Sequence, residues 1–172
     1  MVDELGVYYN TAAIGASVRG ARRALLWRLA IPVVFAVAVC IVWAVSPGQA
    51  GQYAPWFLVV FGVFALGSVI WDLLRLRAVN TDATRVVGGL ALGLNRDGAL
   101  VGQSWFGWAD VATMVLRRGR FGSSDRLIVT GRDQRSEWLP IAYTDAVPGW
   151  LDSVVRALSG GRVAIDWSRL DV

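Results

Sequence analysis

The stretch that decides the fold of the C-terminal half is "GLALGLNRDGALVGQSW", residues 89–105. Leu90, Leu92 and Leu94 alternate with small residues, which places the three leucines on one face of a strand. The turn-forming sequence "NRDG", residues 95–98, comes next, and "ALVGQSW" then reads as a return strand. This stretch therefore predicts a β-hairpin with one apolar face.

Further strands follow downstream. In "VATMVLRR", residues 111–118, successive side chains face opposite sides, with Met114 and Leu116 on the same side. A glycine-serine loop comes next, and "RLIVTG" (126–131) and "SEWLPIA" (136–142) predict two more strands joined by "GRDQR". The segment "AVNTDATRVVGG" that precedes the first hairpin is interpreted as a connector.

The pattern becomes helical in "TDAVPGWLDSVVRALSGG", residues 144–161. Its apolar residues recur at helical spacing: Trp150, Leu151, Val154, Val155 and Leu158. Thr144 or Asp145 can cap this helix, Pro148 suits its first turn, and Gly160-Gly161 ends it. We expect an amphipathic helix that lays one face on the sheet, followed by an extended piece in "VAIDWSRL".

These residues resemble the bacterial pleckstrin-homology-like (PH-like) membrane proteins. The resemblance rests on "LNRDGALVGQSWFGWADVATMVL", in which a Trp-x-Asp-Val corner follows the hairpin, and on "GWLDSVVRAL" as the closing helix. It covers residues 86–160 and implies a bent antiparallel sheet closed by one C-terminal helix, in a cytoplasmic α+β domain spanning 86–172. It implies a binding or scaffolding module and no catalytic residues. In the corner, we expect Trp108 and Val111 in the core, and Asp110 as a turn cap rather than a catalytic acid.

Two uncharged runs precede this domain, "LAIPVVFAVAVCIVWAV" (29–45) and "YAPWFLVVFGVFALGSVIW" (53–71). With their flanks they predict transmembrane helices at 24–46 and 54–76, because about 20 apolar residues cross a hydrocarbon core of roughly 30 Å. The short link "SPGQAGQ" makes the pair a helical hairpin over residues 24–77. A cleaved signal peptide is the alternative for the first run, but 28 residues precede it, which is long for such a leader.

Arginines flank the hairpin and are missing from its loop: Arg19, Arg22, Arg23, Arg28, Arg75, Arg77 and Arg85. The positive-inside rule therefore places the N-terminal segment 1–23 and the C-terminal domain in the cytoplasm. The all-arginine, Ala/Val/Gly-rich composition resembles that of a GC-rich bacterium such as an actinobacterium, so we expect the bacterial inner membrane. Four tryptophans lie near the expected interfaces, as in an aromatic belt: Trp27, Trp43, Trp56 and Trp71. Asp72 is the one acid near the bilayer, and we expect it to pair at the interface with Arg75, one helical turn away.

Composition excludes much of enzymology. All 17 basic residues are arginine, so histidine-dependent triads, histidine metal sites, a Walker lysine and a Schiff-base lysine cannot be built. We expect a non-enzymatic protein without cofactor or metal. The mean hydropathy of +0.49 instead points to the lipid bilayer as the first partner.

The remaining feature is the loop "RRGRFG", in which Arg117, Arg118 and Arg120 precede Phe121. The loop is interpreted as a contact for anionic lipid headgroups or a protein partner, or as a solvated hairpin end; nucleic acid is the least favoured. The leading hypothesis is an accessory or scaffolding protein whose spans pack on other membrane-protein subunits, with a respiratory or other energy-transducing complex as one candidate host. The alternative is a sensor of anionic lipid or membrane state at the cytoplasmic leaflet.

Overall fold

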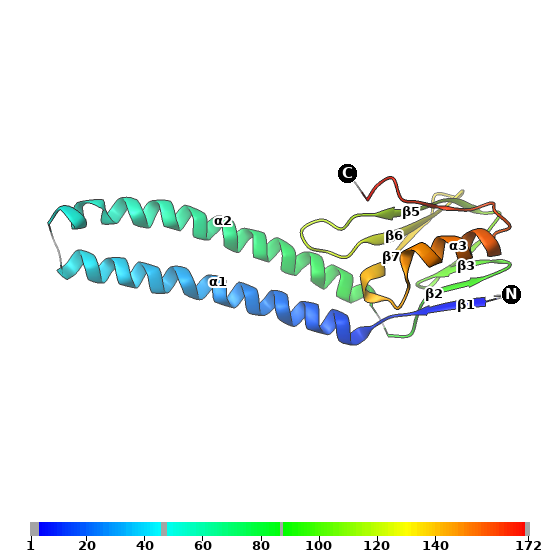
Figure 1. The fold of residues 1–172 in the computed structure, drawn as a ribbon, viewed down its shortest axis with the longest axis horizontal. Coiled ribbons are helices and arrows are strands. Elements are labelled where there is room, and N and C mark those ends of the chain that lie inside the picture. Colours follow the sequence, from blue (N-terminus) through cyan, green and yellow to red (C-terminus); the bar gives the residue numbers. More distant parts are fainter. Residues whose placement is uncertain (1–3, 46–47, 87, 171–172) are drawn as a thin grey trace. The chain divides into compact units, whose positions relative to one another are not determined.

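The computed structural model describes residues 4–45, 48–86 and 88–170. The chain divides into two compact units. Ser17–Arg77 forms one, and Met1–Ala16 together with Ala78–Val172 forms the other. The prediction of two long apolar helices and a sheet-rich α+β region is confirmed (Figure 1).

The helices α1 (Thr11–Val45) and α2 (Gln49–Arg85) are both long and apolar enough to cross a membrane. Their parts within Ser17–Arg77 form the helical unit, and the start of α1 and the end of α2 belong to the other unit. Within Ser17–Arg77 the two helices run antiparallel, because Arg28 lies beside Asp72 and Phe35, further along α1, stacks on the earlier residue Phe61 of α2, with ring centroids 3.9 Å apart (Figure 1). The apolar window of each helix is almost entirely exposed.

Both helices are longer than the segments 24–46 and 54–76 that were predicted to cross the membrane. The helix α1 begins at Thr11, where the Asn10 side chain accepts a hydrogen bond of 3.0 Å from the amide of Ala13. The helix α2 continues to Arg85, so the segment that we interpreted as a connector is mostly helical. A run of apolar residues predicts only the part of a helix that suits a bilayer. It does not predict polar turns at the ends of the helix, which caps or tertiary contacts stabilise.

The β unit contains two four-stranded sheets. The first has the order β1 (Glu4–Tyr8), β2 (Leu90–Asn95), β3 (Gly98–Val101), β4 (Ser104–Gly107), and the second has the order β7 (Ser136–Pro140), β6 (Arg126–Gly131), β5 (Val111–Arg117), β8 (Ile165–Asp166). Among the described strands, all pairings are antiparallel except that of β5 with β8, which is parallel.

Strand β1 comes from the N-terminal segment that the sequence assigned to a separate region. It pairs with β2 from Glu4 opposite Asn95 to Tyr8 opposite Leu90, and Val7 is buried in the core. The β unit is therefore completed by residues that lie on both sides of the helical hairpin in the sequence. A strand as short as "ELGVY" carries too little alternation to be recognised alone.

The "NRDG" turn is confirmed. The Asn95 carboxamide oxygen accepts hydrogen bonds from the amides of Asp97 and Gly98, at 2.8 and 2.9 Å. A Cβ atom on Gly98 would lie 2.2 Å from the carbonyl oxygen of Phe106, so only glycine fits there. The predicted single return strand is wrong, because a turn at Gly102 (φ +60°) splits it into β3 and β4.

The core lies between the sheets and α3 (Pro148–Leu158). Trp108 and Val111 are buried as predicted, and the Trp108 indole N–H donates to the carbonyl oxygen of Asn95 at 2.9 Å. A register shift near Val111 breaks the strict alternation of β5, so Val111 and Met114 are both buried. Leu90, which was predicted on the apolar face with Leu92 and Leu94, is 38% exposed, whereas both of these are buried.

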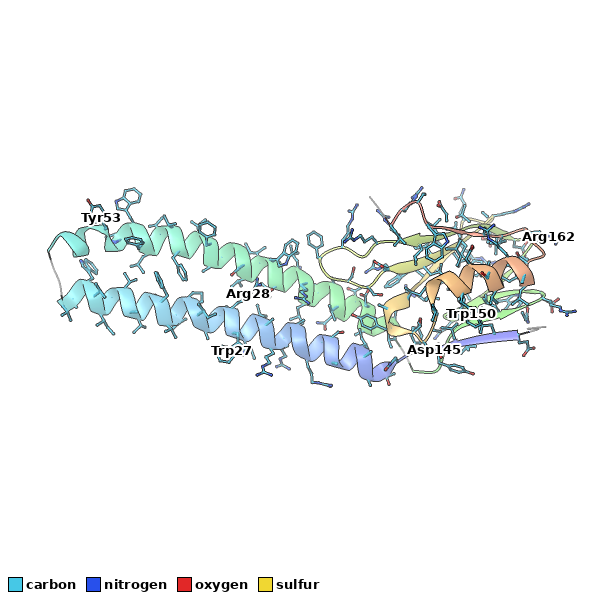
Figure 2. The ribbon with its side chains drawn as sticks, viewed as in Figure 1. Trp27, Arg28, Tyr53, Asp145, Trp150 and Arg162 are labelled. Atoms are coloured by element: carbon cyan, nitrogen blue, oxygen red, sulfur yellow. The ribbon has the colours of Figure 1, made fainter. Side chains whose placement is uncertain are left out.

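The helix α3 buries four of its five predicted apolar residues: Leu151, Val154, Val155 and Leu158. Trp150 is the exception, since it is 47% exposed (Figure 2). The predicted cap is also wrong. The N-cap residue is Val147, while the Asp145 carboxylate accepts a hydrogen bond of 2.8 Å from the amide of Tyr8. Asp145 thus ties the end of β1 to the segment before α3.

Candidate functional site

The arginine loop, which we define as residues 117–125 from the end of β5 to the start of β6, is the part of the β unit where positively charged side chains gather. Arg117, Arg118 and Arg120 are exposed and line a pocket of about 330 Å³. Phe121 belongs to the same loop and is 46% exposed, but it does not line this pocket. The structure thus brings the three predicted arginines together and leaves the predicted aromatic residue aside.

Arg169 completes this arginine pocket, which we define by Arg117, Arg118, Arg120 and Arg169. The segment that carries Arg169 follows β8, and the parallel pairing of β8 with β5 brings it to the loop. The amide of Arg118 donates to the carbonyl oxygen of Arg169 at 3.5 Å. Sequence reasoning missed Arg169, because no local pattern shows which strand β8 will pair with.

The backbone of the arginine loop is held by its own hydrogen bonds. The amide of Gly119 donates to Asp125 Oδ1 at 3.0 Å, and the amide of Ser123 donates to the carbonyl oxygen of Arg120 at 3.0 Å. A Cβ atom on Gly119 would lie 2.1 Å from the Ser123 carbonyl oxygen, so the close turn requires glycine. These contacts restrict the conformations from which the arginine side chains extend.

Asp82, near the end of α2, anchors the same loop from the other side. It is fully buried, and its carboxylate accepts hydrogen bonds from the amide of Ser124 at 2.8 Å and from Arg126 Nη2 at 3.1 Å. The Arg126 guanidinium also lies over the Trp138 ring, 4.2 Å from its centroid. Sequence reasoning missed Asp82, because a single acid in a polar segment carries no signal of burial.

The predicted interfacial pair has a different partner. Asp72 is buried, and its Oδ2 lies 3.2 Å from Nε of Arg28 on α1, so the two side chains form an ion pair without a hydrogen bond to that oxygen. The ion pair therefore bridges the two helices, whereas we had expected a pair with Arg75 along α2. Spacing within one helix could suggest Arg75, but not which residue of the opposing helix lies across from Asp72.

A second cavity, of about 390 Å³, has mixed lining that includes Tyr9, Arg85, Glu137 and Trp138. Arg85 Nη1 and Glu137 Oε2 lie 3.2 Å apart, so the two charges at this cavity largely compensate each other. Burial raises the pKa of the Tyr9 hydroxyl, while the positive charge of Arg85 opposes that shift. This cavity offers neither a net charge nor a strong apolar surface to a ligand.

Among the residues that the structure describes, no group of three His, Cys, Asp or Glu side chains could hold a metal ion. Asp110 lies exposed in the turn before β5, where its amide donates to the carbonyl oxygen of Gly107 at 2.8 Å. Its expected role as a side-chain cap stays a prediction.

Comparisons with known proteins leave the geometry as the basis for any functional conclusion. No protein-family model, no curated protein and no solved structure matches the chain.

Proposed function

We propose that this chain is a non-enzymatic accessory protein of the bacterial cell membrane, with α1 and α2 crossing the bilayer and the β unit docking on the cytoplasmic side. The observation that carries the proposal is the pairing of β1 with β2 across the hairpin. If both helices cross the membrane, β1 and β2 can pair only when the chain returns to the side from which it started. A helical hairpin whose two ends both continue into one folded β unit is an anchor with a docking module.

The apolar surfaces of the helices support a role beside larger membrane proteins. These side chains are exposed in the chain alone, and lipid or the helices of other subunits would cover them. Two helices alone make a poor channel or transporter, because they do not enclose a pathway. Within this proposal, a respiratory or other energy-transducing complex is one class of larger assembly that the helices would contact. For the fold, we propose that α3 closes a PH-like sheet.

Co-purification tests the accessory role. The full chain, expressed in its own cells with an affinity tag at the C-terminus, is extracted in a mild detergent and purified beside a variant in which α1 and α2 are replaced by an unrelated two-helix anchor. We expect one membrane complex of fixed stoichiometry to accompany the natural helices and to be lost with the replaced ones. Purification of the natural chain without any membrane subunit would contradict the accessory role.

The topology makes a separate prediction. In a chain with Cys40 replaced by serine, we expect Gly48→Cys to react with a membrane-impermeant maleimide from outside intact cells. Glu4→Cys and Ser153→Cys, both exposed positions of the β unit, should react only after lysis. Mass shifts on a gel measure the labelling. Labelling of Glu4→Cys and Ser153→Cys on opposite sides of the membrane would refute the paired hairpin. Labelling of both from outside would show that the orientation is opposite to the one proposed.

A second candidate function is the sensing of anionic lipid at the cytoplasmic leaflet. The observation that favours it is the convergence of four exposed arginines on one pocket. Three of them lie at the end of β5 and in the loop that Asp82 fastens to the end of α2. Each arginine near an anionic surface adds about 1 kcal/mol of attraction. Such attraction is diffuse, weakens with salt and depends on surface charge rather than on headgroup structure.

A further inference from the structure

We propose that the arginine pocket is a discrete binding site for a phosphate monoester, either the headgroup of a membrane lipid or a soluble phosphate ester. This inference deepens the second candidate function, because it replaces a diffuse charged surface with one saturable site. It rests on the four arginines that line one pocket, on the partners of the nearby acids, and on the hydrogen bonds that order the arginine loop.

The four arginines come from two separate segments of the chain. Arg117, Arg118 and Arg120 belong to the end of β5 and its loop, and Arg169 approaches from the segment after β8. Charges of one sign repel, so an anionic ligand that binds among the four arginines would relieve their mutual repulsion. The pocket volume of about 330 Å³ lies at the lower end of the range for small-molecule sites.

The acids near this pocket have other partners. Among the described residues, no acidic side chain lines the pocket. Asp125 accepts the amide of Gly119 and thereby shapes the loop. Hydrogen bonds from Ser168 lower the pKa of Asp166, and the charge of Arg169 adds a smaller lowering effect, so Asp166 offsets only part of the positive charge. The pocket therefore keeps a net positive charge at neutral pH.

The chemistry of the lining selects the class of anion. A phosphate monoester carries a charge of about −1.5 to −2 at pH 7 and three acceptor oxygens, and arginine binds such oxygens through paired N–H donors. One carboxylate has two oxygens and a single charge, which serves four guanidinium groups less well. No aromatic side chain lines the pocket among the described residues, so it offers no surface on which a nucleic-acid base would stack.

The order of the loop favours a specific site over a loose surface. Gly119 is held by Asp125, and Ser124 is held by the buried carboxylate of Asp82. Because the backbone is already restrained, a ligand has to order little more than the arginine side chains, which lowers the cost of binding. Phe121 stands outside the lining, so the charged groups at the pocket are those of the four arginines.

The test uses the full chain in nanodiscs of phosphatidylcholine, titrated with inorganic phosphate by calorimetry at constant ionic strength. We expect saturable binding, weakened about tenfold or more by Arg169→Gln, because a hydrogen bond to a charged group contributes about 1.5–3 kcal/mol. Arg120→Gln removes a guanidinium from the other segment and should weaken binding similarly. Arg162→Gln is the matched control, since Arg162 is exposed after α3 and does not line the pocket (Figure 2).

The outcomes separate this inference from the candidate lipid function. Binding that Arg162→Gln weakens as much as Arg169→Gln, or the absence of saturable binding, overturns the pocket, while salt-sensitive attraction to phosphatidylglycerol would still support the diffuse lipid surface. If the pocket is confirmed, the titration is repeated in nanodiscs that contain phosphatidate or phosphatidylglycerol at equal mole fraction. Competition by phosphatidate alone identifies a lipid monoester as the source. If neither lipid competes, the ligand of the pocket is a soluble phosphate ester, and a lipid headgroup is rejected as that ligand.

Discussion

Trp108→Ala is expected to lower the free energy of unfolding of the β unit by about 3–5 kcal/mol. The Trp108 side chain is only 5% exposed, and it belongs to the core that the two sheets share with α3. Alanine would leave a cavity in that core, because the surrounding residues relax only partly. It would also leave the carbonyl oxygen of Asn95 without the indole N–H that it now accepts at 2.9 Å.

Urea denaturation of the full chain in detergent, followed by circular dichroism of the β signal, measures the loss. Trp105→Ala is the matched control, because Trp105 lies on the neighbouring strand β4 and is 46% exposed. We expect it to change stability by less than about 1 kcal/mol. Equal effects of the two substitutions would mean that Trp108 does not hold the core together.

Asp82→Ala is expected to cost about 3 kcal/mol of stability, near the lower end of the range for breaking a buried ion pair. The Asp82 carboxylate is fully buried, whereas the Arg126 side chain is 31% exposed and can recover part of its hydration. The substitution removes the acceptor of the Ser124 amide as well as the partner of Arg126. We therefore expect the arginine loop to loosen more than the rest of the β unit.

Amide hydrogen exchange measures that local effect, with faster exchange expected at Ser124 and its neighbours than in β2. The control is Asp133→Ala, since Asp133 is an exposed partner of Arg135 in the β6–β7 turn. Loss of such a surface pair costs at most about 1 kcal/mol. Unchanged exchange at Ser124 in Asp82→Ala would show that the end of α2 does not hold this loop.

Local patterns predicted much of the fold. The "NRDG" turn, the apolar face of α3 and the burial of Trp108 each depend on neighbouring residues and on a period of two or of 3.6 residues. The predictions failed where the period was interrupted. Gly102 splits one predicted strand into two, and the register shift near Val111 puts Val111 and Met114 inside together.

The candidate site shows the same limit. Arg117, Arg118 and Arg120 are close together in the sequence, so their cluster could be predicted. The fourth residue of the pocket, Arg169, lies there only because β8 pairs with β5. Asp72 was expected to pair with a residue on its own helix and instead lies beside Arg28 of α1. In both cases the partner is distant in the sequence and depends on which surfaces pack together.

The sequence by itself determined two long apolar helices joined by a short link, an α+β region after them and a cluster of arginines, because length, periodicity and charge are local properties of a chain. Only the tertiary structure decided that β1, which precedes the hairpin in the sequence, pairs with β2, which follows it. The same holds for the burial of Asp82 against the arginine loop and for the place of Arg169 in the pocket. Each of these depends on a long-range pairing that is favourable only when the whole β core forms, and no short window of sequence contains both partners.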